Sequence, residues 1–137
     1  TATFFICSGY LDDGLMFNDL ITEAVRQTAL GQIDLGWLKL GQRTLTPATR
    51  RQLANDLTAQ TKYMPPQERQ ETCLRIWRTL CPGAQMPRVM MTPEQVLDLS
   101  RQGMAIGGHT HTHPILTQTA IEHARKERHQ SDAGERD

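Results

Sequence analysis

The sequence between residues 104 and 114 reads MAIGGHTHTHP, a short apolar run that passes directly into three histidines. An apolar run of this length predicts a buried β-strand. The preceding segment, residues 92–103, has the signals of a short helix, with Thr92 as N-cap, Pro93 as first helical residue and Gly103 as C-terminal cap. The stretch is therefore a helix–strand–loop unit whose loop carries the histidines.

The first residues of the chain predict a strand of the same kind. Residues 2–7 read ATFFIC, an almost continuous run of strand-forming residues that is typical of a strand buried on both faces of a parallel sheet. A loop rich in Gly and Asp follows over 8–14, and apolar residues then recur every four positions from Met16 onward, which indicates a helix ended by Gly31. Alternating strands and helices favour an α/β fold.

The region from about 33 to 88 departs from this alternation. Residues 33–45 predict a small hairpin, a helix starts at Pro47, and a second helix follows it. We interpret the region as a helical insert within a core domain of residues 1–117. From 118 to 137 the chain is polar with few apolar residues, which predicts a polar tail that can begin as a helix and is disordered in its final residues.

Composition and charge argue against two classes of binding partner. The chain has 137 residues, 38% of them hydrophobic and 22% charged, and its 15 basic residues balance 15 acidic ones. This balance gives no electrostatic basis for binding nucleic acid or an anionic membrane surface, and no apolar run approaches the ~20 residues of a membrane span. We therefore expect no nucleic-acid partner and no membrane span.

The ends and the cysteines say little about the compartment. The first residues have neither an initiator Met nor the basic region of a signal peptide, which we interpret as the mark of a fragment or truncated product. Cys7, Cys73 and Cys81 lack a paired spacing, which favours buried residues or free thiols. The sequence is consistent with a location in either the bacterial cytoplasm or the cell envelope.

The histidine cluster predicts a site for a divalent metal, most readily zinc, because neutral imidazole is a common ligand of such ions. The histidines follow a strand end, where α/β folds gather their active sites. In a helical turn His109 and His113 lie on one face, whereas in an extended strand His109, His111 and His113 all point the same way. The sequence therefore allows either two or three metal-binding histidines. A catalytic zinc commonly has a third protein ligand. The nearest carboxylates are those of Asp12, Asp13 and Asp19.

The segment IGGHTHTHPIL, residues 106–116, resembles the second motif of the polysaccharide deacetylases, also called the nodulation-deacetylase homology domain or carbohydrate esterase family four. That motif is His-Ser/Thr-x-x-His, usually preceded by Ile-Gly and often followed by Pro. Residues 2–5 are similar to the strand after the family's first motif, and residues 91–103 to the helix before the histidines. The resemblance covers residues 1–31 and 88–117, as in a family member truncated at both ends.

The resemblance implies a partial, distorted barrel of strands and helices. It also implies a metal-dependent enzyme that removes acetyl groups from the acetylated sugars of a polysaccharide or oligosaccharide. His109 and His113 match the metal-binding histidines, and Thr110 matches the residue whose hydroxyl supports the site. His111 matches no family role. The family's Asp-Asp pair, which supplies a metal ligand and the general base, would precede Thr1, so no catalytic residue is identifiable and we expect the isolated chain to be inactive.

Two other interpretations stay open. His-x-His after a strand also occurs in other metal hydrolases, where His109 and His111 would share the ion. The chain is alternatively a non-catalytic carbohydrate-binding or interaction remnant, with Trp37, Tyr63 and Trp77 as contact residues. An incomplete barrel also leaves open sheet edges, through which we expect self-association.

Overall fold

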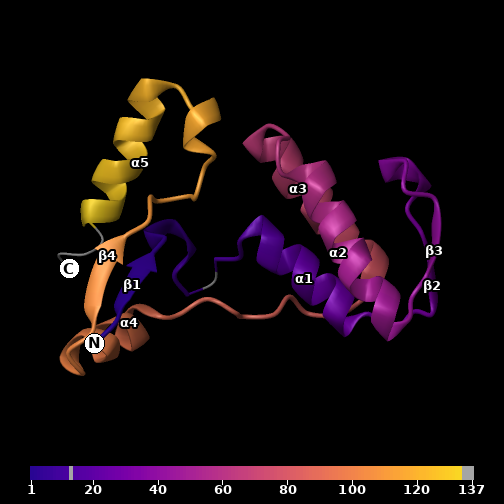
Figure 1. Ribbon diagram of the computed structural model, residues 1–137, viewed down its shortest axis with the longest axis horizontal. Coiled ribbons are helices and arrows are strands. Elements are labelled where there is room, and N and C mark those ends of the chain that lie inside the picture. The colour runs from indigo at the N-terminus through magenta and orange to yellow at the C-terminus, as the bar shows by residue number, and fades with distance from the viewer. Residues whose placement is uncertain (13, 134–137) are drawn as a thin grey trace. The chain divides into compact units, whose positions relative to one another are not determined.

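The computed structural model describes residues 1–12 and 14–133 and forms two compact units. Unit 1 comprises residues 1–15 and 88–137, and unit 2 comprises residues 16–87. The mixed α/β class that the sequence predicts is confirmed, with α-helices and short strands in the same chain (Figure 1). The described strands form two separate two-stranded sheets and no closed barrel.

Unit 1 is built on a parallel pair of strands. β1 (Thr3–Ile6) pairs with β4 (Ala105–Gly108), and Ile6 lies opposite Gly108, so both strands end at the same level. The parallel pairing agrees with the parallel sheet that residues 2–7 predict. The predicted burial of β1 on both faces is wrong, since Phe5 is 65% exposed. A sheet of two strands offers too few neighbours to cover both faces.

Helix α4 (Pro93–Arg101) leads into β4 and has the predicted caps. The Thr92 hydroxyl accepts a hydrogen bond from the Gln95 N–H at 3.3 Å, and the Gln95 side chain accepts one from the Thr92 N–H at 2.9 Å. Gly103 has a φ of +83°, the left-handed conformation of a C-terminal glycine cap. The apolar face is less buried than predicted, because Leu97 is 46% exposed.

Helix α5 (Ile121–Ala133) covers most of the segment that the sequence predicts as a polar tail beginning as a helix. The segment contains few apolar residues, but Glu127 and Ser131, one turn apart, are only 3% and 2% exposed. Two polar residues are therefore buried in a helix that composition alone assigns to solvent. Residues 134–137 lie outside the described residues. In Figure 1 α5 follows the end of β4, whereas α4 precedes its start.

Unit 2 is a helical unit with a small hairpin. Its helices are α1 (Phe17–Gln27), α2 (Pro47–Thr61) and α3 (Pro66–Leu80), and α1 packs on both α2 and α3. The predicted N-cap is present, since the Thr46 hydroxyl accepts from the Thr49 N–H at 3.2 Å. The buried apolar residues of these helices are Leu20, Ile21, Ala24, Val25, Leu53, Leu57, Cys73, Ile76, Trp77 and Leu80. Trp77 is thus a core residue rather than a surface contact.

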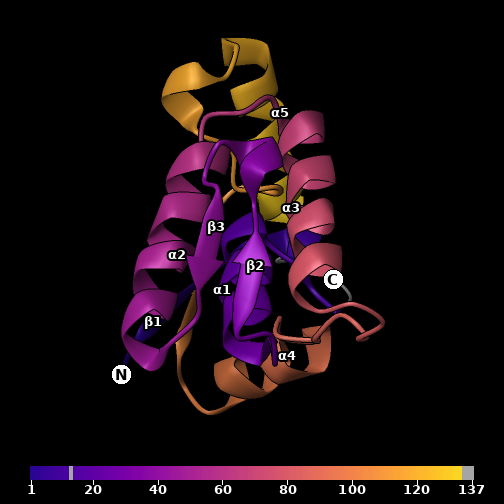
Figure 2. The same cartoon turned by 90° about the vertical axis from the view of Figure 1, so that its right-hand side faces the viewer.

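The predicted hairpin is present as β2 (Gln32–Asp34) and β3 (Gln42–Thr44), which pair antiparallel. The strands are shorter than the apolar pattern suggests, because a 3-10 turn (Gly36–Leu38) interrupts it. Figure 2 looks onto the hairpin, with α2 and α3 on either side of it in that view. The Arg75 guanidinium lies 4.0 Å from the centre of the Trp37 ring and covers that aromatic.

The second unit begins earlier than the predicted insert, at residue 16 instead of about 33, and ends at residue 87. The difference arises from α1, whose apolar stripe packs on α2 and α3. Periodicity predicts that one helix face is buried, but it does not say whether a sheet or other helices cover that face.

The three cysteines are buried free thiols, as the spacing predicts. Burial raises the pKa of the Cys73 thiol to about 11, so this thiol stays protonated at neutral pH. Among residues 1–12 and 14–133, no helix combines the length and the apolar character that crossing a membrane requires.

Candidate metal centre

Two loops meet where β1 and β4 end. The first follows β1 and contains Gly9, and the second comprises residues 109–113 and is called the histidine loop. The His109 N–H donates to the Ile6 carbonyl at 2.8 Å, and the Gly9 N–H donates to the His111 carbonyl at 2.9 Å. Backbone hydrogen bonds therefore fix the histidine loop to the end of β1.

The histidine loop brings two of its three imidazoles together. Nε2 of His109 and Nε2 of His113 are 3.1 Å apart, and the ring centroids are separated by 4.8 Å. Neither a helical turn nor an extended strand produces this contact, because Thr110 and His113 have left-handed φ angles of +63° and +52°. Pro114 follows directly and disfavours the right-handed helical conformation at His113. The loop thus forms a pair and not a triple.

Thr110 supports the loop through its side chain. Its hydroxyl accepts a hydrogen bond from the His113 N–H at 3.1 Å. A left-handed conformation at a β-branched residue costs about 1–3 kcal/mol, and such strain persists only where surrounding contacts hold it. The hydroxyl of Thr110 is one of these contacts, and it acts on the backbone of a candidate ligand.

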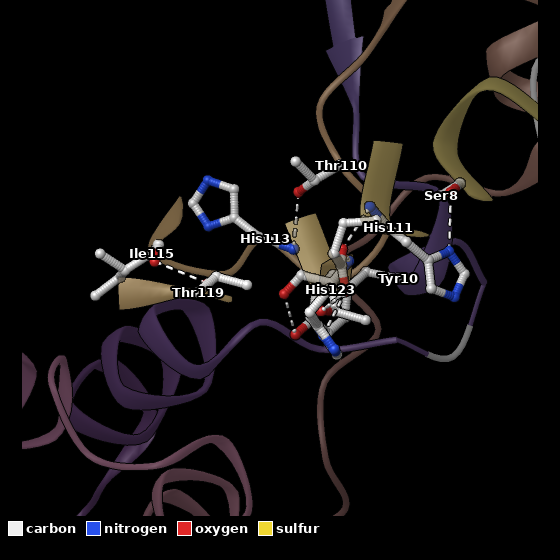
Figure 3. Close-up of polar contacts among 10 residues, drawn as sticks. Ser8, Tyr10, Thr110, His111, His113, Ile115, Thr119 and His123 are labelled. Atoms are coloured by element: carbon white, nitrogen blue, oxygen red, sulfur yellow. Dashed lines mark hydrogen bonds and ion pairs between the residues drawn. The ribbon is translucent and has the colours of Figure 1, made fainter. Parts of the chain in front are cut away.

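His111 faces away from the pair. Its Nδ1 lies 3.0 Å from the Ser8 hydroxyl oxygen, and Figure 3 shows its ring directed toward Ser8 while the His113 ring extends to the other side of the loop. Gly9 makes this close approach possible, because a Cβ there would lie 2.6 Å from the His111 carbonyl oxygen and 3.1 Å from its ring. The ring that a His-x-His site would need is therefore directed elsewhere.

One carboxylate in this region was not predicted from the sequence. Glu127 of α5 is 3% exposed. Its Oε2 accepts from the N–H groups of His111 at 2.9 Å and Thr112 at 2.6 Å, and its Oε1 accepts from the Thr112 hydroxyl at 2.6 Å. His123 Nε2 lies 3.6 Å from Oε1. Glu127 thus binds the centre of the histidine loop.

Hydrogen bonding keeps this carboxylate charged. Burial raises the pKa of Glu127. Hydrogen bonds from the Thr112 hydroxyl, the Thr112 N–H and the His111 N–H lower it by more than burial raises it, so the pKa lies below its usual value. The sequence carries only a weak signal for this role. The spacing of His123, Glu127 and Ser131 places them on one helix face, but a polar face does not reveal burial.

The pair fits two positions of a zinc site. Two nitrogens held about 2.0–2.1 Å from one zinc at near-tetrahedral angles lie about 3.3–3.4 Å apart. The observed 3.1 Å between the Nε2 atoms differs from this by a small ring movement. The same distance also fits a hydrogen bond in which one Nε2–H donates to the other Nε2. The geometry is therefore compatible with metal binding but does not require it.

A third ligand does not join the pair among the described residues, where no group of three His, Cys, Asp or Glu could hold a metal ion. Asp12 is exposed with a φ of +63°, and its N–H donates to the Met91 carbonyl at 3.0 Å. Asp13 lies outside the described residues. Asp19 belongs to the first turn of α1 in unit 2, where it accepts a hydrogen bond from the Asn18 amide at 3.2 Å.

Comparison with known proteins gives no relative from which a function could be transferred. No family model, no curated protein and no solved structure matches the chain. The function is therefore argued from the histidine loop, its motif and its position at the strand ends.

Proposed function

We propose that unit 1 carries the histidine half of a metal-dependent polysaccharide deacetylase site, with His109 and His113 as ligands of a divalent ion, most readily zinc. The observation that carries the proposal is the 3.1 Å approach of the two Nε2 atoms beside the shared end of two parallel strands. Active sites of α/β folds gather at that end. The substrate class, N-acetylated sugars of a cell-wall or exopolysaccharide, comes from the resemblance of the motif.

Two features of the histidine loop support this assignment over another metal hydrolase. The Thr110 hydroxyl binds the His113 backbone, in line with a residue that supports the site. The His111 ring is hydrogen-bonded to Ser8, in line with a residue that has no ligand role. In a His-x-His hydrolase His111 would instead face the ion together with His109.

We also propose that β1 and β4 are neighbouring strands of a distorted strand–helix barrel. Their parallel pairing supports this arrangement, and so does the position of α4 directly before β4 in the chain. In this proposal unit 2 (residues 16–87) is the inserted part between the two strands.

In the proposed site each residue has a separate task. His109 and His113 would hold the ion through Nε2, and Thr110 would fix the backbone of His113. A divalent ion bound there would polarise an amide carbonyl and lower the pKa of a bound water. Deacetylation also needs a carboxylate as general base. Since no acidic ligand joins the pair within the described part of the chain, we expect the chain alone to bind metal weakly and to be inactive.

Metal titration tests the ligand assignment. We expect the full chain to bind Co²⁺ or Zn²⁺, and His109→Ala and His113→Ala each to weaken binding more than about tenfold, or 1.4 kcal/mol. His111→Ala is the matched control, because it removes an imidazole of the same loop that faces Ser8. Loss of binding in His111→Ala but not in His113→Ala, or no binding by the unmodified chain, would overturn the assignment.

An activity assay tests the functional half of the proposal. The chain is incubated with zinc and an acetylated chito-oligosaccharide, and released acetate is measured. We expect no release above a metal-only control, and clear zinc-dependent release by this exact chain would refute the expected inactivity. Oligosaccharide binding that persists after chelation and in His109→Ala would instead favour the carbohydrate-binding remnant.

A further inference from the structure

The carboxylate of Glu127 accepts three hydrogen bonds from two consecutive residues of the histidine loop. Oε2 takes the N–H groups of His111 and Thr112, and Oε1 takes the Thr112 hydroxyl. These two residues lie between His109 and His113. A contact at this point controls how the two halves of the loop are oriented relative to one another.

The backbone carbonyl groups of the same two residues are also hydrogen-bonded. The His111 carbonyl accepts from the Gly9 N–H at 2.9 Å, and the Thr112 carbonyl accepts from the Tyr10 hydroxyl at 3.1 Å. Glu127 therefore completes a set in which every backbone polar group of the loop centre has a partner. Buried carboxylates are retained only where such partners compensate for lost water, so the arrangement is specific.

Glu127 also links α5 to the histidine loop through hydrogen bonds. Ile121 is 68% exposed, and the buried described residues of α5 are Glu127 and Ser131, both polar. Helices usually dock through an apolar stripe. A helix that docks instead through a charged group aimed at one loop fixes that loop more precisely than apolar packing does, because hydrogen bonds are directional.

We propose that Glu127 is a positioning residue for the His109–His113 pair, and that it acts through the backbone of His111 and Thr112. The role as a support of metal binding rests on the proposed function. Its role in holding the histidine loop in place does not rest on that function, because this role concerns only contacts within unit 1. By anchoring the loop centre, Glu127 holds the strained turns at Thr110 and His113 that bring the two Nε2 atoms together.

The experiment compares four variants of the full chain. Glu127→Ala removes every acceptor, whereas Glu127→Gln keeps an oxygen for the two N–H groups and an amide that can donate to the Thr112 hydroxyl. Thr112→Val removes one hydrogen bond and keeps the side-chain shape. Glu122→Gln is the matched control, since Glu122 lies on the same helix with its side chain 76% exposed.

Two readouts separate positioning from mere folding. The first is the NMR cross-relaxation between the ring protons of His109 and His113, which reports their approach without any metal. The second is the affinity for Co²⁺ and its absorption spectrum. We expect Glu127→Ala to lose the ring contact and about ten- to a hundredfold in affinity, the range typical of groups that orient metal ligands. Thr112→Val should lose less, Glu127→Gln should retain most of both, and Glu122→Gln should match the unmodified chain.

Each other outcome counts against the inference. An unchanged ring contact in folded Glu127→Ala overturns it, and so does equal loss of metal affinity in the Ala and Gln variants with the ring contact intact, which would indicate charge rather than position. If Glu127→Ala does not fold, the decision passes to Thr112→Val, whose ring contact must then be weakened. If the unmodified chain binds no metal, the proposed function fails. The ring contact alone then tests whether Glu127 positions the histidine loop.

Discussion

Replacing Glu127 by Gln tests whether the charge of this buried carboxylate stabilises unit 1. Gln has the same length, so its carbonyl oxygen can accept from the His111 and Thr112 N–H groups that Oε2 now receives. Its amide nitrogen would face the Thr112 hydroxyl, which can accept as well as donate. The substitution therefore keeps the number of hydrogen bonds and removes the charge.

The expected magnitude follows from the hydrogen bonds. A hydrogen bond to a charged acceptor contributes about 1.5–3 kcal/mol, against about 0.5–1.5 kcal/mol for a neutral one. If the three hydrogen bonds were independent, removing the charge would lower their combined contribution by about 3 kcal/mol. Hydrogen bonds that share one group are not additive, so the loss is smaller. We expect Glu127→Gln to lower the free energy of unfolding of unit 1 by about 1–3 kcal/mol at pH 7. His123, 3.6 Å from Oε1 with its side chain 63% exposed, contributes little to this difference.

The loss must depend on pH in one direction. Burial raises the pKa of Glu127, yet its hydrogen bonds lower it more, so the pKa in the folded chain lies below the usual value. A depressed pKa means that the stabilisation is fully present above the unfolded value, about 4.3, and is lost as pH falls through the folded pKa. The difference between the unmodified chain and Glu127→Gln should therefore shrink toward zero in acid.

Urea unfolding at pH 7 and at stepwise lower pH measures this difference. Because the chain has two compact units, the probe has to lie in unit 1, and the NMR amide signal of Thr112 serves this purpose. Glu122→Gln should stay within about 0.5 kcal/mol of the unmodified chain at pH 7. A difference for Glu127→Gln that stays constant or grows as the pH falls would refute the reasoning.

Three further changes probe other parts of the structure. Gly9→Ala places a Cβ 2.6 Å from the His111 carbonyl oxygen, so we expect a displaced histidine loop and about 1–3 kcal/mol of lost stability; unchanged amide shifts at His111 would contradict this. Thr92→Ala removes half of a capping box and should cost about 1 kcal/mol in urea unfolding; a neutral result would show that α4 needs no cap. Sedimentation should show self-association that Thr3→Lys on β1 reduces and that Thr22→Lys, at an exposed position of α1, does not. A monomer at all concentrations would exclude edge pairing.

Local signals in the sequence were the most informative about the fold. The capping residues of α4, the left-handed Gly103 and the hairpin at residues 32–44 all follow from short-range chemistry, and the structure contains each of them. The apolar run at residues 2–7 predicted a strand of a parallel sheet, and β1 does pair in parallel, but the burial on both faces that the same run predicted is absent. Such features depend on a few neighbouring residues, and therefore a single sequence contains the information.

Features that depend on distant partners were not predictable. The stripe on α1 indicates a buried face, but α2 and α3 rather than a sheet cover it. The spacing of the histidines allowed either two or three imidazoles to face one another. The left-handed conformation at Thr110 and His113 brings together only the imidazoles of His109 and His113. Nothing in a polar helix distinguishes Glu127 from its solvated neighbours before the fold places it against the histidine loop.

The contacts that hold the histidine pair are internal to unit 1, and this has a consequence for how the site works. Hydrogen bonds to the end of β1, to the Thr110 hydroxyl oxygen and to the Glu127 carboxylate fix the loop, so in the proposed site the two imidazoles would need little further ordering to bind an ion. Preorganisation of this kind raises affinity by removing an entropic cost rather than by adding ligands. It does not replace a general base, because proton transfer needs a carboxylate within hydrogen-bond reach of the water. In the proposed site, metal binding and deacetylation would therefore depend on different groups. Glu127 would act on the first through the histidine loop, whereas the second would also need a general base.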